Sequence, residues 1–254
     1  MNNTIAPPTL QQRLVERQRP ESPVVMYQRW EQLLFLHWKW EPERVQSTLP
    51  PGLHVDTFAG DAYVGIVPLF MRNVRPRMLP AVPTISDFLE LNLRTYVYDG
   101  TGRPGLYFYS LDCDQPIAVE AAKRLLNLRY EHAEMKAEVD AEGWVDFESH
   151  RDGTVLTDRF RYKAFGPAGE AYPESLEFFL LERYRLFAAG SGEQLHSIRV
   201  CHAPYIMQQA QVTHWGDAVL RYAKFDTNGR APDHICFARP QDVEVFAPET
   251  VNAS

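Results

Sequence analysis

The sequence lacks any hydrophobic segment long enough to cross a membrane, and it lacks an excess of basic residues. Its longest apolar run covers residues 64–71, well short of the roughly 20 residues that a membrane-spanning helix needs. Its 26 lysines and arginines are outnumbered by 33 aspartates and glutamates, which gives a formal net charge of −7. A nucleic-acid-binding domain normally carries a basic surface. Neither a membrane span nor a nucleic-acid partner is therefore expected.

Cysteine is scarce, and its positions form no recognisable framework. Cys113, Cys201 and Cys236 are an odd number of residues, lie far apart and include no C-x-x-C pair. We expect reduced thiols in a cytoplasmic protein rather than disulfides or zinc ligands. The polar N-terminus, with three arginines among its first 19 residues, also lacks the apolar core of a signal peptide.

Several common catalytic and metal-binding motifs are absent. The chain contains no G-x-x-x-x-G-K-[ST], no G-x-S-x-G and no H-E-x-x-H sequence. These motifs supply a phosphate-binding loop, an exposed serine nucleophile and a pair of zinc ligands, respectively. Neither a cofactor nor a metal is therefore expected.

Turn-forming and aromatic residues are abundant. Nineteen prolines and twelve tyrosines indicate many short segments with firm turns, which favours strands over a helical bundle. We expect one mainly β (α+β) domain at residues 24–247, a polar N-terminal arm at 1–23 and a polar tail at 248–254. Two principal helices are expected outside the sheet, at residues 115–127 and 173–189, because both segments carry an apolar stripe with helical spacing. Residues 26–40 fit a strand or a helix, and residues 72–88 fit a long loop.

One segment has the alternating pattern of a strand and carries side chains of the kinds that bind ligands. In a strand, alternate side chains share a face, so Glu90, Asn92, Arg94 and Tyr96 are expected on one face. A polar face of this kind in an antiparallel sheet is commonly solvated. However, an acid, an amide, a guanidinium and a phenol are groups that bind a ligand, so a polar lumen is the alternative. Glu90 and Arg94 are about 13 Å apart along the strand, which suits the two ends of one ligand.

Further candidates lie outside this segment. Tyr107 belongs to a neighbouring strand whose two faces are both semi-apolar, as in a closed or covered sheet. Arg183 falls on the apolar stripe of the second expected helix, where a buried guanidinium needs a carboxylate or a ligand as its partner. His37 and His202 have apolar or aromatic neighbours, and a structural role is expected for both.

The order of several motifs resembles one bacterial family of unknown function, the YqjF-like family. The resemblance covers roughly residues 25–246. The fold of this family is related to that of acetoacetate decarboxylase. The resemblance therefore implies a single-domain β-barrel of cone-like halves with an internal pocket. The motifs follow Trp38 and are residues 50–53 (PPGL), 56–58 (DTF), 62–68 (AYVGIVP), 90–97 (ELNLRTYV), 105–112 (GLYFYSLD) and 182–184 (ERY).

The resemblance also has implications for the chemistry. Acetoacetate decarboxylase uses a lysine that forms a Schiff base with its ketone substrate. The matching stretch here places Tyr130 at the nucleophile and Glu131 beside it, and the nearest lysine, Lys123, lies in the middle of an expected helix. Glu90 matches the pocket glutamate of the decarboxylase. The fold and the acidic group are thus expected to be retained, and Schiff-base decarboxylation is not.

Three functions stay open on the sequence alone. The first is an enzyme that acts on a small carbonyl or carboxylate compound, with Glu90 and Tyr130 as catalytic residues. Its ligand-binding residues would be Asn92, Arg94, Tyr96, Tyr107 and Arg183. The second is a non-catalytic binding or sensing protein with the same pocket, and the third is a scaffold whose polar strand face meets solvent or a partner. A homo-oligomer stays open in each case.

Overall fold

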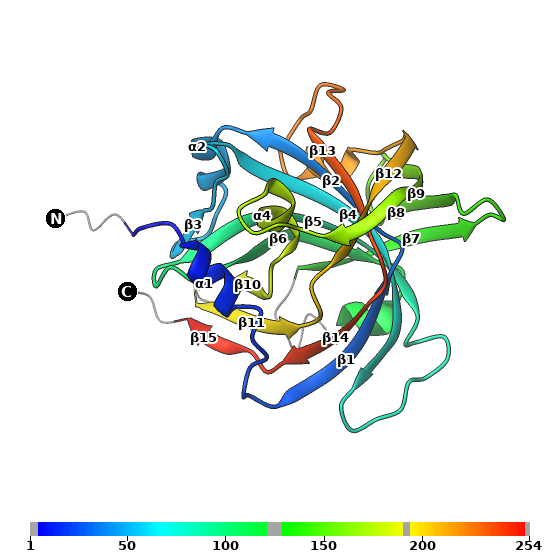
Figure 1. Ribbon diagram of the computed structural model, residues 1–254. Coiled ribbons are helices and arrows are strands. Elements are labelled where there is room, and N and C mark those ends of the chain that lie inside the picture. Colours follow the sequence, from blue (N-terminus) through cyan, green and yellow to red (C-terminus); the bar gives the residue numbers. More distant parts are fainter. Residues whose placement is uncertain (1–4, 121–128, 190–193, 252–254) are drawn as a thin grey trace.

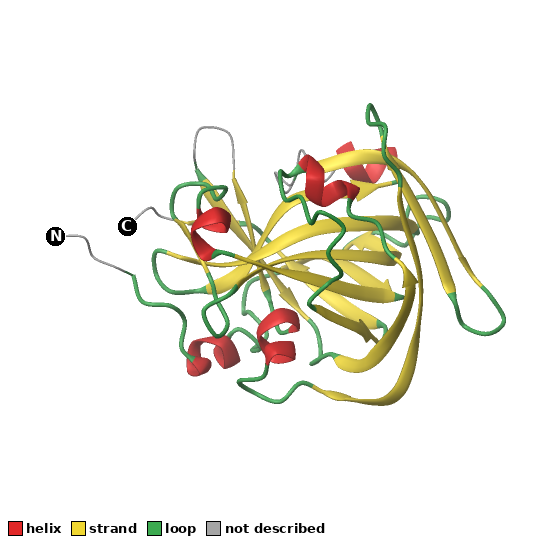
Figure 2. Ribbon diagram, turned by 90° about the horizontal axis from the view of Figure 1, so that it is seen from above, coloured by secondary structure: helices red, strands yellow, loops and turns green. Residues whose placement is uncertain are grey.

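The computed structural model describes residues 5–120, 129–189 and 194–251 (Figure 1). Within them the chain is mostly β and forms one ring-like sheet of 15 strands with short helices at its margins (Figure 2). This confirms the expected mainly β fold class. The helices are α1 (Leu10–Val15), α2 (Pro42–Gln46), α4 (Leu176–Leu181) and α5 (Ala218–Tyr222). The strands are β1 (Val24–Glu31), β2 (Leu33–Trp40), β3 (Leu53–Val55), β4 (Ala62–Pro76), β5 (Phe88–Asp99), β6 (Pro104–Cys113), β7 (Tyr130–Val139), β8 (Val145–Arg151), β9 (Asp158–Glu170), β10 (Arg185–Ala189), β11 (Leu195–Cys201), β12 (Ile206–His214), β13 (His234–Ala238), β14 (Gln241–Phe246) and β15 (Glu249–Val251).

The strand pairings form two closed circuits that share three strands. The first ring runs through β1, β14, β11, β10, β6, β5 and β4 and closes where β4 pairs with β1. The second ring runs from β6 through β7, β8, β9, β12, β13 and β2 to β4, and closes through β5. Strands β4, β5 and β6 are therefore a common wall with one face toward each ring.

The common wall explains the alternating pattern of β5. Leu91 and Leu93 belong to the hydrophobic core of the second ring, together with Phe147 and Phe160. The residues between them point the other way, into the first ring, and all twelve residues of β5 are buried. A strand covered on both faces has no solvated side. The interpretation that the polar face of β5 is solvated is therefore wrong.

The region expected to be one long helix at residues 173–189 divides into two elements. Helix α4 starts at its N-cap, Ser175, whose Oγ accepts a hydrogen bond from the backbone N–H of Phe178, and it ends at Leu181. Residues 185–189 form β10, which pairs with β11 and with β6. The helical prediction is wrong here because backbone pairing with two strands overrides a helix-like apolar stripe. In the other expected helix, residues 116–120 are helical, and residues 121–127 lie outside the described residues.

Other expectations are resolved in favour of strands. Residues 26–40 belong to β1 and β2, which are separated by Gln32 in a left-handed conformation with φ of 54°. The loop expected at residues 72–88 is shorter, since β4 continues to Pro76 and β5 begins at Phe88. Residues 249–251, expected in a polar tail, form β15 and pair with β11.

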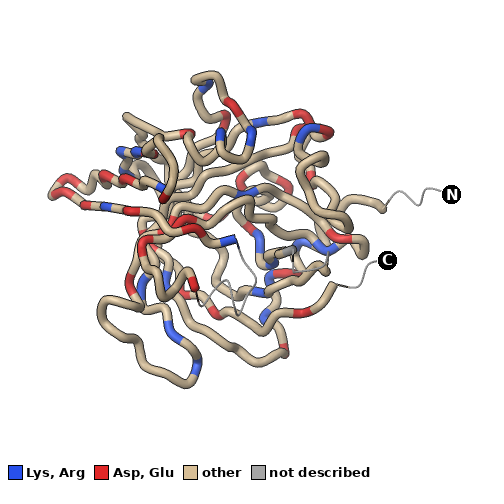
Figure 3. Tube along the Cα trace, turned by 180° about the vertical axis from the view of Figure 1, so that it is seen from behind, with Lys and Arg blue, Asp and Glu red and all other residues tan. Residues whose placement is uncertain are grey.

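The N-terminal arm lies against the rest of the molecule. Its helix, α1, begins with a capping box in which the hydroxyl of Thr9 accepts from the backbone of Gln12 while the side chain of Gln12 accepts from the backbone of Thr9. Within the described residues, no helix is both long and apolar enough to cross a membrane. Basic and acidic residues are interspersed along most of the chain (Figure 3), with acidic residues concentrated on the β7–β8 hairpin.

Candidate functional site

The first ring encloses a cavity of about 80 Å³. Every strand of that ring contributes side chains to its wall, together with α4 and neighbouring residues of β2 and β7. An apolar cavity of roughly 150 Å³ holds a benzene molecule in an engineered protein, so this one suits a ligand of only a few heavy atoms. Most of the wall is aliphatic or aromatic. The polar residues in it are Gln28, Glu90, Asn92, Arg94, Tyr130, Arg183 and Tyr205.

Glu90 and Tyr130 form a hydrogen-bonded pair at one side of the cavity. The hydroxyl of Tyr130 donates to Oε2 of Glu90 over 2.7 Å. Burial raises the pKa of Glu90 to about 7, although the hydrogen bonds from Tyr130 and Asn92 oppose that rise. Burial also raises the pKa of Tyr130, and the neighbouring carboxylate adds to the effect. The pair can therefore hold or release one proton near neutral pH.

Asn92 connects this pair to the rest of β5. Its amide Nδ2 lies 3.4 Å from Oε1 of Glu90. Its Oδ1 is buried and has no hydrogen-bond partner among the described residues. An acceptor of this kind is available to a ligand that carries a donor group.

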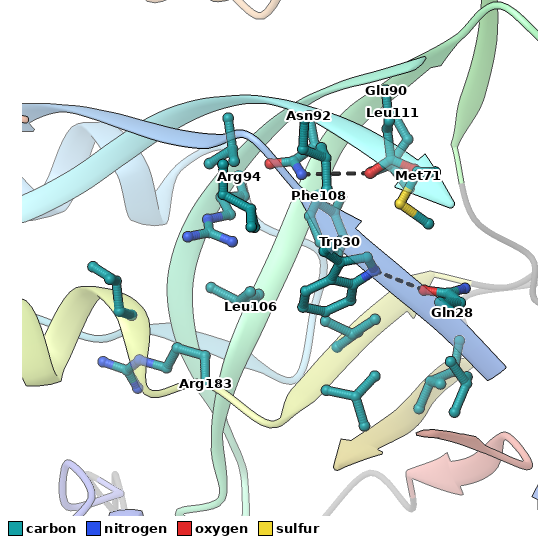
Figure 4. Close-up of a pocket in the computed structure, with 18 of the residues that line it drawn as sticks. Gln28, Trp30, Met71, Glu90, Asn92, Arg94, Leu106, Phe108, Leu111 and Arg183 are labelled. Carbon is teal, nitrogen blue, oxygen red and sulfur yellow. Dashed lines mark hydrogen bonds between the residues drawn. The ribbon is translucent and has the colours of Figure 1, made fainter. Parts of the chain in front are cut away.

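Arg94 is buried with one edge of its guanidinium unused. It is 7% exposed, and its Nε and Nη2 have no hydrogen-bond partner in the part of the chain that the structure describes. The guanidinium lies 5.0 Å from the centre of the Phe35 ring. Figure 4 shows Arg94 and Arg183 on one side of the cavity, with Glu90 on the other. A buried cation without an anionic partner is costly, and the Nε–Nη2 edge matches the two oxygens of a carboxylate.

Two of the three guanidinium nitrogens of Arg183 have a partner. Its Nη1 lies 2.9 Å from Oδ2 of Asp56, and its Nε donates to the backbone oxygen of Phe179 over 2.7 Å. Its Nη2 is buried without a partner among the described residues. Burial lowers the pKa of Arg183 to about 10, against the opposing effect of Asp56. The expected carboxylate partner is thus Asp56, and Arg183 also lines the cavity.

Two predicted ligand-binding residues are not in the cavity wall. Tyr96 is fully buried beneath the arginines, with its ring 5.3 Å from the guanidinium of Arg183 and its hydroxyl 2.7 Å from Nε2 of His37. Tyr107 belongs to a separate hydrophobic cluster with Val97 and Phe187.

A β-bulge explains the position of Tyr107. Leu93 of β5 pairs with Ser110, and Arg94 pairs with Phe108, so Tyr109 is an extra residue in β6. An extra residue reverses the alternation of side chains along a strand. Leu106 and Phe108 before the bulge, and Leu111 after it, therefore face the cavity.

The cavity also contains residues that the sequence did not indicate. The indole N–H of Trp30 donates to Oε1 of Gln28 over 2.9 Å on the wall formed by β1 (Figure 4). Strand alternation at residues 26–40 could have placed both side chains on one face, had the choice between strand and helix been settled. Asp56 belongs to a motif of the family resemblance, but nothing in the sequence pointed to a partnership with Arg183.

No lysine within the described residues lines the cavity. Lys123 lies outside the described part of the chain, and Glu131, expected beside the nucleophile position, is exposed. Among the residues that the structure describes, no group of three or more His, Cys, Asp or Glu side chains is arranged to hold a metal ion.

Comparisons with known sequences agree on one family. The model of DUF2071, described as an uncharacterized conserved protein, matches residues 27–242. The uncharacterized protein YqjF of Bacillus subtilis (strain 168) is 34% identical to this chain over 193 residues, which are 76% of this chain and 78% of that protein.

Comparisons with solved structures give similar folds at low identity. An acetoacetate decarboxylase-like enzyme from Sphingomonas wittichii RW1 has a TM-score of 0.65 at 13% identity, covering 91% of this chain and 95% of that one. The enduracididine biosynthesis enzyme MppR, complexed with the condensation product of pyruvate and imidazole 4-carboxaldehyde, has a TM-score of 0.64 at 12% identity, covering 91% and 90%. Acetoacetate decarboxylase from Legionella pneumophila has a TM-score of 0.62 at 12% identity, covering 93% and 91%. These similarities establish a shared fold.

Proposed function

Since the chain belongs to the DUF2071 family of uncharacterized conserved proteins and has the same fold as acetoacetate decarboxylase-like enzymes, we propose a function from the cavity itself. The cavity binds a small carbonyl or carboxylate compound in the cytoplasm, and Glu90 and Tyr130 transfer a proton to or from it. No Schiff-base lysine takes part.

The observation that carries this proposal is the unused edge of Arg94. Two buried N–H donors on one guanidinium edge, with no partner among the described residues, make a bidentate site for a carboxylate. In water such an arginine would be solvated, whereas in an apolar cavity its charge favours an anionic ligand. Arg94 therefore anchors the carboxylate, and the free Nη2 of Arg183 supports the same end of the ligand.

The opposite side of the cavity supplies the proton chemistry. A general acid or base is most effective when its pKa lies near the working pH, and burial raises the pKa of Glu90 to about 7. The ionised Glu90 accepts a proton from the carbon next to a ligand carbonyl. The hydroxyl of Tyr130, held 2.7 Å from Glu90, and the amide of Asn92 keep the carboxylate in place. Arg94 stabilises the negative charge that develops on the ligand.

The size of the cavity and the ligands of proteins with this fold support the same compound class. A space of about 80 Å³ limits the ligand to one of the smallest carbonyl or carboxylate compounds. MppR, which has this fold, has been solved in complex with pyruvate. Pyruvate and acetoacetate are therefore suitable probes for the first experiments.

The test of binding compares wild type with Arg94→Met, which retains a long apolar side chain over Phe35. We expect pyruvate and acetoacetate to raise the melting temperature of the wild type, and the neutral ketone acetone to leave it unchanged. Losing a charge-assisted bidentate contact should weaken carboxylate binding about 10- to 100-fold. Arg129→Met, at an exposed arginine outside the cavity wall, is the control and should bind as the wild type does. Equal binding by Arg94→Met would refute the anchoring role.

Proton transfer is tested separately by exchange of the methyl hydrogens of pyruvate in D₂O, followed by NMR. Wild type should accelerate this exchange, and Glu90→Gln should lower the acceleration by about 10²- to 10⁴-fold while pyruvate still binds. Binding without any exchange in the wild type would instead support the second candidate, a non-catalytic binding or sensing protein. That candidate is favoured by Arg94 alone, because its free edge needs only an anion and not a reaction.

A further inference from the structure

Asp56 joins the N-terminal arm to the cavity. Its carboxylate is fully buried and faces two guanidinium groups. Arg13 of α1 contacts both of its oxygens, with Nη1 2.6 Å from Oδ2 and Nη2 2.8 Å from Oδ1. Arg183, which lines the cavity, lies 2.9 Å from Oδ2. One buried negative charge is thus shared by a residue of the arm and a residue of the candidate ligand site.

The same arm holds the helix that lies at this end of the cavity. The guanidinium of Arg13 lies 5.2 Å from the ring centre of Phe179, and that of Arg17 lies 5.0 Å from the ring centre of Phe178. Arg17 also pairs with Glu182 at the end of α4 over 3.1 Å. Leu181 of α4 is part of the cavity wall. The arm therefore packs on the outer side of an element whose inner side faces the ligand site.

The contacts of the arm are mainly electrostatic. Helix α1 buries none of its side chains completely, so it adds little hydrophobic stabilisation. Its attachment comes from ion pairs, which include Arg13 with Asp56, Arg17 with Glu182, and Glu16 with Arg185 and Arg199. An element held in this way separates from the sheet at a lower free energy than the core strands do.

We propose that residues 9–18 form a strap over the cavity and that Asp56 couples the docking of this strap to ligand binding. The coupling rests on the proposed function, since it requires an anionic ligand. When Arg13 is docked, the Asp56 carboxylate pairs with two guanidinium groups at once. It then neutralises Arg183 less completely, and Arg183 attracts an anionic ligand more strongly. When Arg13 is displaced, Asp56 neutralises Arg183 alone, and an anion binds less tightly.

The reverse effect follows from thermodynamic linkage. An anion near the free Nη2 of Arg183 competes with Asp56 for that guanidinium, which leaves Asp56 more available to Arg13. Ligand binding and docking of the strap then strengthen each other by the same factor. Asp56 and Arg13 are positioning residues in this scheme, because they act on the ligand through Arg183.

The test compares Arg13→Ala with Arg19→Ala. Both substitutions remove an ion pair of the same arm, but Arg19 pairs with Glu244 at an exposed position away from the cavity wall. Hydrogen exchange at residues 9–18 measures docking of the strap, and calorimetry with pyruvate measures binding. Arg13→Ala should speed the exchange and weaken pyruvate binding at least about fivefold. Arg19→Ala should bind pyruvate as the wild type does, and pyruvate should slow exchange of the wild-type strap. Unchanged pyruvate affinity in Arg13→Ala would overturn the coupling and leave the proposed function intact.

A ligand-free measurement separates the two proposals if pyruvate does not bind. Removing Arg183 as a competitor for Asp56 should slow exchange of the strap in Arg183→Gln, and Arg183→Met, which is also uncharged, serves as the second variant if the first does not fold. The effect should vanish when Arg13→Ala is added. Equal exchange of the strap with and without the Arg183 substitution would overturn the coupling through Asp56. Absence of carboxylate binding alone would refute only the proposed function and the ligand half of the linkage.

Discussion

At the scale of single residues, Glu90 has a protonation state that is set by its surroundings. Desolvation raises its pKa from 4.5 to about 7. In the unfolded chain the group ionises at its ordinary pKa, so between these two pH values the folded protein binds more protons than the unfolded one. Stability therefore falls as the pH rises through this window. Above pH 7 the fold contains a buried carboxylate whose charge is unfavourable.

Replacement of Glu90 by Gln should remove this dependence on pH. A neutral amide of similar shape avoids the buried charge, so Glu90→Gln should be more stable than wild type at pH 8. The difference in unfolding free energy between the two proteins should grow by about 2 kcal/mol from pH 5.5 to pH 8. Urea unfolding at both pH values measures it. A wild type that gains stability relative to the variant as the pH rises would show that the carboxylate is favourably ionised.

The residues of β5 were the most predictable part of the site. Alternation alone placed Glu90, Asn92 and Arg94 on one face, and the structure brings all three to one cavity. Burial of that face could not be inferred from β5 itself, because the covering strands come from distant parts of the chain. Tyr107 lies outside the cavity wall because of a single bulged residue in β6, and a bulge of this kind leaves no clear mark in a strand made of aromatic residues.

At the scale of secondary-structure elements, β2 and β4 approach each other closely where Gly65 pairs with His37. A Cβ atom at Gly65 would lie 2.6 Å from Cδ2 of His37. The histidine ring cannot readily move, since its Nε2 contacts the hydroxyl of Tyr96 and its Nδ1 lies 3.0 Å from Nδ1 of His234. The register of the two strands therefore depends on the absence of a side chain at this position.

Gly65→Ala should destabilise the protein by about 1–3 kcal/mol through overpacking. Gly169→Ala is the matched control, because a Cβ there meets no atom within 4 Å of the described structure. The control should leave stability unchanged or raise it slightly. Thermal unfolding of both variants provides the comparison. Similar melting temperatures for the two would mean that His37 moves aside without cost.

Helices were harder to predict than strands. The apolar stripe at residues 173–189 fitted a helix, but only Leu176–Leu181 adopt one. The segment that follows receives its hydrogen bonds from β11, which lies a few residues further along the chain, and from β6, whose paired residues lie 80 positions earlier. Local periodicity contains no information about partners at such distances, and tertiary pairing decided between the two structures.

At the scale of the whole molecule, stability is distributed unevenly. Strand β5 of the common wall is buried on both faces, whereas the N-terminal arm is held by ion pairs and its helix, α1, buries no side chain completely. The screening length of salt shortens from about 10 Å at 0.1 M to about 3 Å at 1 M. Salt therefore acts on the arm more than on the sheet.

Raising NaCl from about 0.1 M to about 1 M should speed hydrogen exchange at residues 9–18 severalfold and leave exchange in β5 nearly unchanged. Mass spectrometry of the two peptides in one sample measures both effects, and the β5 peptide serves as the internal control. An equal response of the two peptides would show that the arm opens only when the whole protein unfolds.

The family resemblance, rather than the residue pattern, supplied the overall architecture. Composition and turns indicated a mainly β chain, but closure of the sheet depends on the pairing of β1 with β4 and on the parallel contacts of β6 with β7 and β10. Two of these pairings, β1 with β4 and β6 with β10, join segments that are far apart in sequence. Physical arguments from the sequence alone predict the mainly β fold class and the shared polar face of β5. They do not predict that the sheet closes into two rings.

The common wall has a consequence for protein engineering. Odd-numbered positions 89, 91 and 93 of β5 fill the core of the second ring, and even-numbered positions 90, 92 and 94 line the cavity of the first. A combinatorial library restricted to the three even positions would thus vary the chemistry offered to a ligand while the packed foundation behind it stays intact. Selection on such a library could change the specificity of the cavity to cationic or neutral compounds through substitutions in β5 alone.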